Sequence, residues 1–267
     1  MTETADAAAD DLPLTGERTV PGISEENYWF RRHEVVYLDL LALCRDRVVV
    51  DAGFGEGYGA NLIAGVATRV FGVDYDASAV DHVARRYPSV EVMRGNLAAL
   101  PVGDAAAGVV VNLQVIEHLW DQEQFLRECH RVLEAGGRLI ISTPNRITFS
   151  PGRETPLNPF HTRELDAGEL TGLLEGAGFA VESMRGVHHG PRLAALDARH
   201  GGSIIDAQID RAVAGQPWPA QLRDDVAGVA ADDFVLSDTD IDGSLDLVAV
   251  AVKPEDSVKP GETAKQR

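Results

Sequence analysis

The sequence contains little cysteine and few positive charges. Only two cysteines, Cys44 and Cys129, occur among 267 residues. Both lie in apolar, helix-like segments, so we expect reduced core residues and no disulfide framework. Lysine and arginine total 24 against 42 acidic residues, which gives a formal net charge of −18. This charge repels phosphate backbones and anionic membrane surfaces, so nucleic acid is not an expected partner.

Targeting and membrane-spanning patterns are also missing. The first residues, MTETADAAADD, lack the positive region and apolar core of a signal peptide. No uncharged apolar run approaches the roughly 20 residues that a membrane helix needs. We therefore expect a cytoplasmic protein with no membrane partner. The polar segments 1–14 and 254–267 are predicted to be disordered tails, which leaves a single domain over residues 15–253.

Strand and helix patterns alternate along the chain. Segment 24–46 is apolar at helical spacing after Ser24, which suits an N-cap. Seven strands are expected after it, at 47–52, 69–75, 90–95, 108–113, 138–144, 179–187 and 244–252. Strands separated by helices predict an α/β, Rossmann-like fold, a seven-stranded, mostly parallel sheet with helices on both faces. Two insertions, 144–162 and 188–238, interrupt this rhythm, and loops of such length are usually functional.

A glycine-rich loop follows the first strand in the stretch VVVDAGFGEGYGANL, residues 48–62. Glycines occupy every second position from 53 to 59, where backbone can approach a ligand closely. A dinucleotide-binding loop needs a small residue where this chain has Tyr58, and the Gly-Lys-Ser/Thr of a P-loop is absent. Asp51 and Glu56 would oppose a phosphate. The loop therefore suits a ligand that carries an ammonium group.

A second acid, Asp74, ends the next strand. In doubly wound nucleoside sites, an acid at about this place hydrogen-bonds the ribose hydroxyls. A nucleoside with a cationic, amine-bearing tail would satisfy both Asp51 and Asp74.

In these residues the sequence resembles the class I S-adenosylmethionine (SAM)-dependent methyltransferases. The resemblance covers roughly residues 15–190 and includes VVVDAGFGEGYGA, GVDYD, GNLAALP and LQVIEHL. It implies SAM as cofactor. The segment LTGERTVPGISEENYWFRRHEVV resembles the entry segment of sugar-associated methyltransferases, which implies Arg18 as partner of the methionine carboxylate and the leading helix as a lid over the cofactor. Asn96 departs from the Asp of many relatives, so an adenine contact would use its carbonyl. The residues assigned to the cofactor are Arg18, Trp29, Asp51, Gly53, Gly55, Gly57, Asp74, Tyr75, Asn96, Leu97 and Gln114.

The residues after the fourth strand narrow the acceptor. NLQVIEHL lacks the Pro-Pro-aromatic motif of DNA amino methyltransferases, and the acidic composition is unlike that of RNA methyltransferases. A small neutral acceptor remains, with hydroxyl favoured over amine. His118 is the candidate general base, or else it braces the next helix while the proton leaves to water. Glu117 orients His118 or, together with it, holds a divalent cation such as Mg²⁺.

The insertions supply candidate acceptor contacts. His161, in NPFHTREL, either braces the proline-rich loop or touches the substrate. Polar residues in 188–238 suit either salt bridges among themselves or a polyhydroxylated ligand. The residues assigned to substrate binding are His161, His188, His189, Arg192, Asp197 and Arg199.

A further resemblance covers the whole chain, including LTGERTVPGISEENYWFRRHEVV near its start. The chain is similar to the sugar 1-O-methyltransferases of methylmannose polysaccharide biosynthesis. This implies a saccharide partner and methylation of the 1-hydroxyl of a short 3-O-methylated mannoside. The residues themselves leave open another small neutral acceptor, such as a quinone, a natural product or another sugar position, and a non-catalytic SAM-binding module. The 188–238 insertion suits either a lid or the surface of a homodimer.

Overall fold

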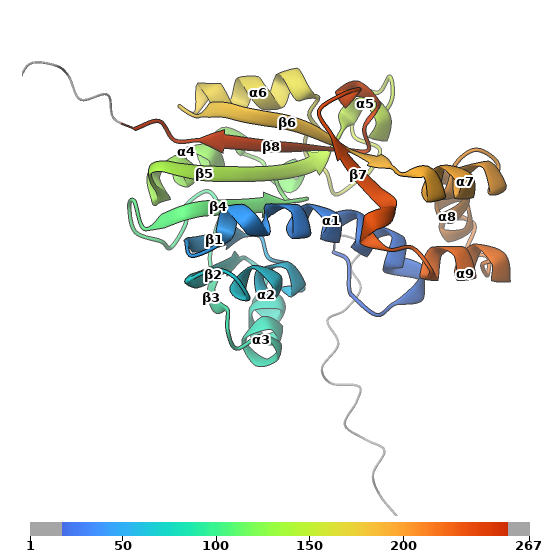
Figure 1. Ribbon diagram of the computed structural model, residues 1–267, viewed down its shortest axis with the longest axis horizontal. Helices are drawn as coiled ribbons and strands as arrows, with labels where there is room; N and C mark the ends of the chain where they lie inside the picture. The colour runs from blue at the N-terminus through green and yellow to red at the C-terminus, as the bar shows by residue number, and fades with distance from the viewer. Residues whose placement is uncertain (1–17, 256–267) are drawn as a thin grey trace, which may run out of the picture.

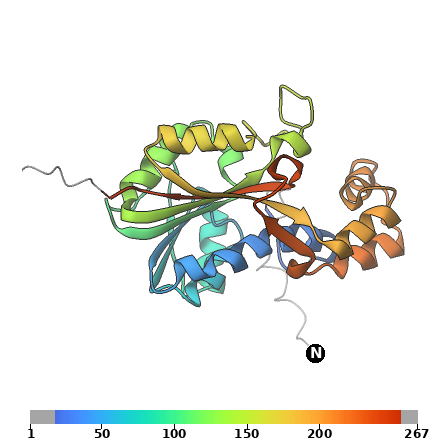
Figure 2. The ribbon, with the colours of Figure 1, turned by 45° about the horizontal axis from the view of Figure 1, so that its top comes forward.

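The computed structural model describes residues 18–255. The predicted tails, 1–14 and 254–267, lie outside this range except for Pro254 and Glu255. Within it, one sheet forms the middle layer and helices cover both of its faces, as Figure 2 shows nearly edge-on. This is the expected Rossmann-like α/β arrangement.

The first five strands form the parallel half of the sheet, in the spatial order β3-β2-β1-β4-β5. The order reverses between β1 and β4, so a crevice forms at the carboxyl ends of these two strands. Their side chains are buried on both faces, which explains their continuous apolar runs. The strands are β1 Val48–Ala52, β2 Arg69–Asp74, β3 Glu91–Arg94, β4 Ala107–Leu113 and β5 Leu133–Pro144.

The other half of the sheet corrects the predicted strand number and orientation. Residues 18–255 contain eight strands, not seven, because β7 (Phe234–Ser237) pairs antiparallel with β6 (Ala180–His189) inside the 188–238 insertion. Four residues at a sheet edge give too short a pattern to separate from a loop. The last strand, β8 (Asp246–Val252), lies between β5 and β6 and runs antiparallel to both. The sheet is therefore mixed.

Two helical layers pack on the sheet, since neighbouring strand residues point to opposite faces. Val49 joins the cluster with α1 (Asn27–Cys44), α2 (Tyr58–Ala64) and α3 (Ala77–Arg86). Val50 joins the cluster with the helices α4 and α6 on the other face. These helices span Gln122–Val132 and Ala167–Gly176, and the short α5 spans Arg146–Phe149. The 3₁₀ turns are η1 Ser24–Glu26, η2 Ile116–His118, η3 Ala231–Asp233 and η4 Ile241–Gly243.

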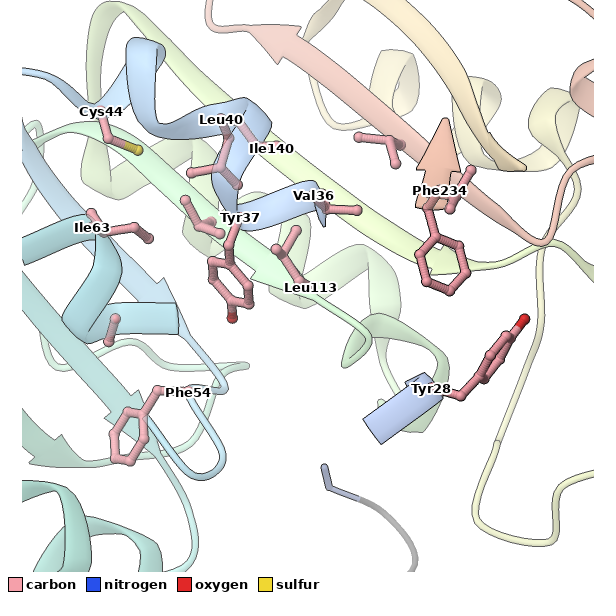
Figure 3. Close-up of a cluster of buried hydrophobic side chains, with 14 of the residues drawn as sticks. Tyr28, Val36, Tyr37, Leu40, Cys44, Phe54, Ile63, Leu113, Ile140 and Phe234 are labelled. Carbon is pink, nitrogen blue, oxygen red and sulfur yellow. The ribbon is translucent and has the colours of Figure 1, made fainter. Parts of the chain in front are cut away.

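Helix α1 supplies much of the first cluster. Figure 3 shows Val36, Tyr37 and Leu40 directed from α1 toward the sheet. Cys44 ends the same helix and is a buried free thiol, as is Cys129 on α4, so the predicted reduced core cysteines are confirmed.

The 188–238 insertion builds a helical block beyond the end of the sheet (Figure 1). It contains α7 (Pro191–Arg199), α8 (Ile204–Val213) and α9 (Ala220–Ala227). The start of α1 is attached to this block, because Nδ2 of Asn27 donates to carbonyl oxygens at the end of α9. No helix within residues 18–255 combines the length and the apolarity that a membrane span requires.

Candidate active site

Two adjoining cavities lie at the carboxyl end of the parallel strands. The main cleft, of about 1280 Å³, runs from the glycine loop and Asp74 to the segment Pro159–Thr162. The side cavity, of about 310 Å³, lies between α1, the end of β5 and α8. A ligand-binding cleft at the reversal point of the strand order is typical of doubly wound folds. The residues that line both cavities are Arg18, Thr19, His33, Gln114, His118 and His161.

The glycine loop needs glycine for conformational and steric reasons. Gly53 and Gly57 have φ values of 91° and 92°, a region that side chains disfavour. A Cβ on Gly53 would lie 2.7 Å from Val115, and one on Gly57 would lie 2.4 Å from Val83. The loop is therefore packed closely between the end of β4 and α3.

Glu56, in the same loop, directs its carboxylate toward its own protein. It accepts hydrogen bonds from the Tyr87 hydroxyl (3.1 Å) and the Tyr58 N–H (3.1 Å), and lies 2.9 Å from Nε2 of His82. The side chain is almost fully buried. Helix α3, which carries His82, thus braces the loop from behind.

Asp51 and Asp74 end adjacent strands but differ in their partners. Asp74 accepts hydrogen bonds from the N–H groups of Gly55 and Asp76, each at 3.0 Å, and lines the main cleft. Asp51 is fully buried, and neither of its carboxylate oxygens has a hydrogen-bond partner within residues 18–255. Burial, and secondarily the charge of Asp74, raises the pKa of Asp51 to about 7. An ammonium group would give this carboxylate the partner it lacks.

Arg18 presents the opposite charge. Its Nη2 donates to Asp76 at 2.6 Å, while its buried Nη1 has no partner among the residues that the structure describes. Since Arg18 lines both cavities, a ligand carboxylate would satisfy this N–H group.

The other predicted cofactor residues divide between lining and supporting positions. Trp29 lines only the side cavity, with the Arg32 guanidinium carbon 5.5 Å from its ring centre. Asp51 and Gly57 line neither cavity. Those that line the main cleft are Arg18, Gly53, Gly55, Asp74, Tyr75, Asn96, Leu97 and Gln114.

His118 stands where the two cavities meet. Its Nδ1 lies 3.1 Å from the backbone oxygen of Phe160. A carbonyl oxygen can only accept, so Nδ1 donates, and in the neutral ring Nε2 carries the lone pair. That is the tautomer a general base requires.

His161 and Glu117 are neighbours of His118: His161 contacts its ring and Glu117 precedes it in the chain. The rings of His118 and His161 meet edge to face, with centroids 4.9 Å apart. His161 lies 2.7 Å from Glu164 through Nδ1 and 3.1 Å from Nδ2 of Asn158 through Nε2, so both ring nitrogens are engaged. Buried Glu117 accepts from Thr143 Oγ1 at 3.0 Å, and burial raises the pKa of its carboxyl to about 8.

The same three side chains can form a cation site. Glu117, His118 and His161 offer one ligand atom each, and these atoms lie within 4.8 Å of one another. One carboxylate and two imidazoles suit a divalent cation, although imidazole favours metals softer than Mg²⁺. The sequence identified Glu117 and His118 for this role but not His161, because residues so far apart in the chain meet only after folding.

The structure does not bring the polar residues of the 188–238 insertion to either cavity. His189 lies 2.6 Å from both the Tyr28 hydroxyl and Asp197. Arg192 pairs with Asp233, and Arg199 pairs with Asp225. His188 lies on β6, opposite β7. These contacts hold the helical block together, which is the salt-bridge alternative that the sequence left open.

Several lining residues carried no sequence signal. His33 and Tyr37 face the main cleft from α1, and Phe149 and Asn158 face the side cavity from the 144–162 insertion. Trp120 lies on the rim of the main cleft with 94% of its surface exposed. Only an exposed tryptophan directly after the LQVIEHL motif could have been noticed in advance.

The protein has a doubly wound fold with a cleft at the point where the strand order reverses, a buried acid at the end of β1 and a second acid beside the cleft at the end of β2. Comparison with known proteins identifies the family. A methyltransferase-domain family model matches residues 50–141. A Mycolicibacterium smegmatis protein described as a probable SAM-dependent methyltransferase is 65% identical over 257 residues, which cover 95% of this chain and 100% of that protein. A Mycobacterium tuberculosis protein with the same description is 64% identical, with 91% of this chain and 90% of the relative covered. The chain belongs to the SAM-dependent methyltransferases.

Solved structures support the fold alone. A SAM-dependent methyltransferase from Mesorhizobium loti has a TM-score of 0.53 at 17% identity, covering 86% of this chain and 98% of that one. The [4+2]-cyclase SpnF has a TM-score of 0.55 at 22% identity, covering 85% and 81%. Because a cyclase shares the fold, the acceptor must be argued from the site.

Proposed function

We propose that this methyltransferase acts on a sugar hydroxyl, the 1-hydroxyl of a short 3-O-methylated mannoside in polymethylated polysaccharide synthesis. The observation that carries the proposal is the position of His118 at the boundary of the main cleft and the side cavity. Most of the residues suited to SAM line the main cleft, and the side cavity leaves room for a second molecule next to His118. The choice of sugar and position rests on the sequence resemblance.

The residues of the chain would prepare both reactants. Asp51 and Arg18 suit the ammonium and carboxylate of the cofactor tail, and Asp74 suits the ribose hydroxyls. When bound, SAM would supply an electrophilic methyl group for the acceptor oxygen. Nε2 of His118 receives the hydroxyl proton, and the Phe160 carbonyl holds the ring in the required tautomer. Placement of the two partners supplies much of the remaining rate.

Labelled SAM with a panel of mannosides tests the acceptor. Methyl incorporation is expected with 3-O-methylmannose and is expected to disappear when the anomeric oxygen is already blocked. Incorporation that persists after this blocking would exclude the 1-hydroxyl as the target. Binding of S-adenosylhomocysteine without turnover of any acceptor would instead favour a non-catalytic module.

A His118→Ala variant tests the base. Turnover is expected to fall by about 10² to 10⁴, the usual contribution of a positioned general base, while the affinity for S-adenosylhomocysteine stays unchanged. His130→Ala, on α4 and outside both cavities, is the matched control. Near-normal turnover of His118→Ala would leave the histidine a bracing role only.

Divalent cation binding is an alternative role for His118, because a metal ion on Nε2 would use the lone pair that otherwise takes the proton. Mg²⁺ would be held by Glu117, His118 and His161, and its binding would release the proton that buried Glu117 retains at neutral pH. Calorimetry with Mg²⁺ alone should detect binding and proton release in the native protein and neither in Glu117→Gln. Full activity after EDTA treatment, with no heat of Mg²⁺ binding, would remove the cation from the mechanism.

A further inference from the structure

We infer that the side cavity receives one pyranose ring of the acceptor, with Trp29 against one face of the ring and Glu26 accepting a hydrogen bond from a ring hydroxyl. The inference rests on the proposed function. It assigns Trp29 to acceptor binding, whereas the sequence resemblance assigned Trp29 to cofactor binding.

The walls of the side cavity favour a second ligand over an extension of the cofactor. The nucleoside-side residues Asp74, Tyr75, Asn96 and Leu97 line only the main cleft. Glu26, Trp29 and Arg32 line only the side cavity. His118 lies on the wall that both share. A molecule in the side cavity could therefore lie next to His118 without occupying the positions of the nucleoside-side residues.

One face of the N-terminal helix forms a wall of this cavity. Glu26 ends η1 and precedes α1, and Trp29 and Arg32 follow at intervals of three residues, so the three side chains lie on the same side of this segment. Phe149 and Asn158 line the cavity from the 144–162 insertion, and Ile209 lines it from α8. The two inserted segments and the leading helix, which are separate in sequence, thus enclose one space.

With Arg18 assigned to the cofactor carboxylate, the remaining charges in this wall favour a neutral, hydroxyl-bearing ligand. Arg32 is buried and already satisfied, because Nε and Nη2 each lie 2.6 Å from Asp246 and Nη2 also donates to the Leu245 oxygen at 2.9 Å. Glu26 makes no side-chain hydrogen bond or ion pair within residues 18–255. A carboxylate in the cavity wall that has no partner among the described residues can accept hydrogen bonds from hydroxyl groups, and it repels an anionic ligand.

Size and shape favour a single ring. The volume of about 310 Å³ is at the small end of the range for ligand pockets. Trp29 is half-buried, so one part of its indole is anchored in the core while another part remains at the cavity. A flat aromatic surface beside convergent polar groups matches a pyranose, which has apolar C–H faces and a polar hydroxyl rim. Phe149 and Ile209 add apolar surface on which an O-methyl group can rest.

The test measures saccharide binding separately from turnover. 3-O-methylmannose is titrated into the protein saturated with S-adenosylhomocysteine, and binding is followed by NMR. Glu26→Gln is expected to weaken saccharide affinity about tenfold, as for loss of a hydrogen bond to a charged group. Trp29→Ala is expected to weaken it about three- to tenfold, and Trp29→Phe should restore part of the loss. S-adenosylhomocysteine affinity should stay within about twofold of the native value in both variants, because substitutions at a separate site change binding free energies elsewhere only slightly.

Glu25→Gln is the matched control, because it removes the same charge one residue away and outside both cavities. It should bind the saccharide like the native protein.

Native saccharide affinity in both Glu26→Gln and Trp29→Ala would overturn the inference, even if the enzyme methylates the mannoside. A loss of S-adenosylhomocysteine affinity in both would also overturn it, since the cavity would then belong to the cofactor. Saccharide binding that depends on Glu26 and Trp29 but gives no methyl transfer would uphold the cavity assignment and contradict only the proposed function. No saccharide binding to the native protein would contradict both.

Discussion

At the scale of single residues, Asp51 shows how a binding site can oppose stability. A fully buried carboxylate without a hydrogen-bond partner is unfavourable in its charged form, and this raises its pKa to about 7. The folded, ligand-free protein therefore binds a proton at Asp51 more tightly than the unfolded chain does. Its stability falls as pH rises from the ordinary aspartate range through about 7.

The first prediction follows from this linkage. S-adenosylhomocysteine affinity should increase as pH rises from 5.5 to 8, because the ligand ammonium binds the ionised form of Asp51. Asp51→Asn should weaken the affinity by about tenfold or more at pH 8, equivalent to about 1.5 to 3 kcal/mol, and should remove the pH dependence. The same variant should raise the Tm of the ligand-free protein at pH 8. Calorimetric titration and thermal unfolding measure the two effects.

A ligand without the amino acid tail provides the control for Asp51. 5′-Methylthioadenosine has the nucleoside but no ammonium group, so its affinity should change little with pH or in Asp51→Asn. An equal loss for both ligands would show that Asp51 supports the fold of the loop and does not contact the tail.

Residue types at strand ends could be predicted from sequence, whereas side-chain partners could not. Asp51, Asp74 and His118 are predictable because Asp51 and Asp74 lie at the ends of strand patterns and His118 follows shortly after another. The direction of Trp29 depends on which face of α1 packs on the sheet, and the meeting of His161 with His118 depends on the path of the 144–162 insertion. Neither property is encoded in local spacing.

At the scale of elements, the glycine loop depends on the helix behind it. The His82 side chain from α3 meets Glu56 at 2.9 Å in a buried site, and the Tyr87 hydroxyl after the same helix donates to Glu56. Asp76 caps the start of α3 and also pairs with Arg18. Helix α3 therefore positions both the glycine loop and the Arg18 guanidinium next to it.

The second prediction concerns this helix. His82→Ala should lower the free energy of unfolding by about 1 to 3 kcal/mol, since the buried Glu56 loses a hydrogen-bond partner. It should also weaken S-adenosylhomocysteine binding, although His82 lines neither cavity. Denaturant unfolding and ligand titration measure these losses. Asp81→Ala, on the exposed side of α3, should change neither. Native-like ligand affinity in His82→Ala would mean that the loop keeps its shape without this support.

Long, regular elements could be predicted better than their limits. The βαβ alternation placed five parallel strands near their observed positions because buried strands need continuous apolar runs. The strand β7 is not predicted from the sequence, because its four residues form a strand through pairing with β6 and not through a pattern of their own. Two successive glycines at 136 and 137 are typical of a helix end, but α4 already ends at Val132 and β5 starts at Leu133, where it pairs with Ala107.

At the scale of the whole molecule, α1 connects the sheet domain with the helical block. Its C-terminal half packs in the main core, and its first residue reaches the far end of α9. Nδ2 of Asn27 lies within 3.1 Å of the carbonyl oxygens of Val226, Ala227 and Val229. The last carbonyls of a helix lack intrahelical partners, so this amide caps α9 from another part of the chain. The same helical block carries Ile209, on α8, to the side cavity.

The third prediction tests this connection. Asn27→Ala should lower the free energy of unfolding by about 1 to 3 kcal/mol, because several buried or partly buried carbonyls lose their donor. Hydrogen exchange should quicken first in α9 and α8, while the amides of β1 and β4 keep their protection. Asn61→Ala, which removes an exposed asparagine from α2, should leave both stability and exchange unchanged. If exchange in Asn27→Ala instead increased equally in the strands and the block, the two parts would unfold as one unit, and the amide of Asn27 would not be the local connection that its position suggests. Slower hydrogen exchange in the helical block than in the sheet would contradict the prediction outright. The least stable part of the molecule would then be the core between α1 and the sheet.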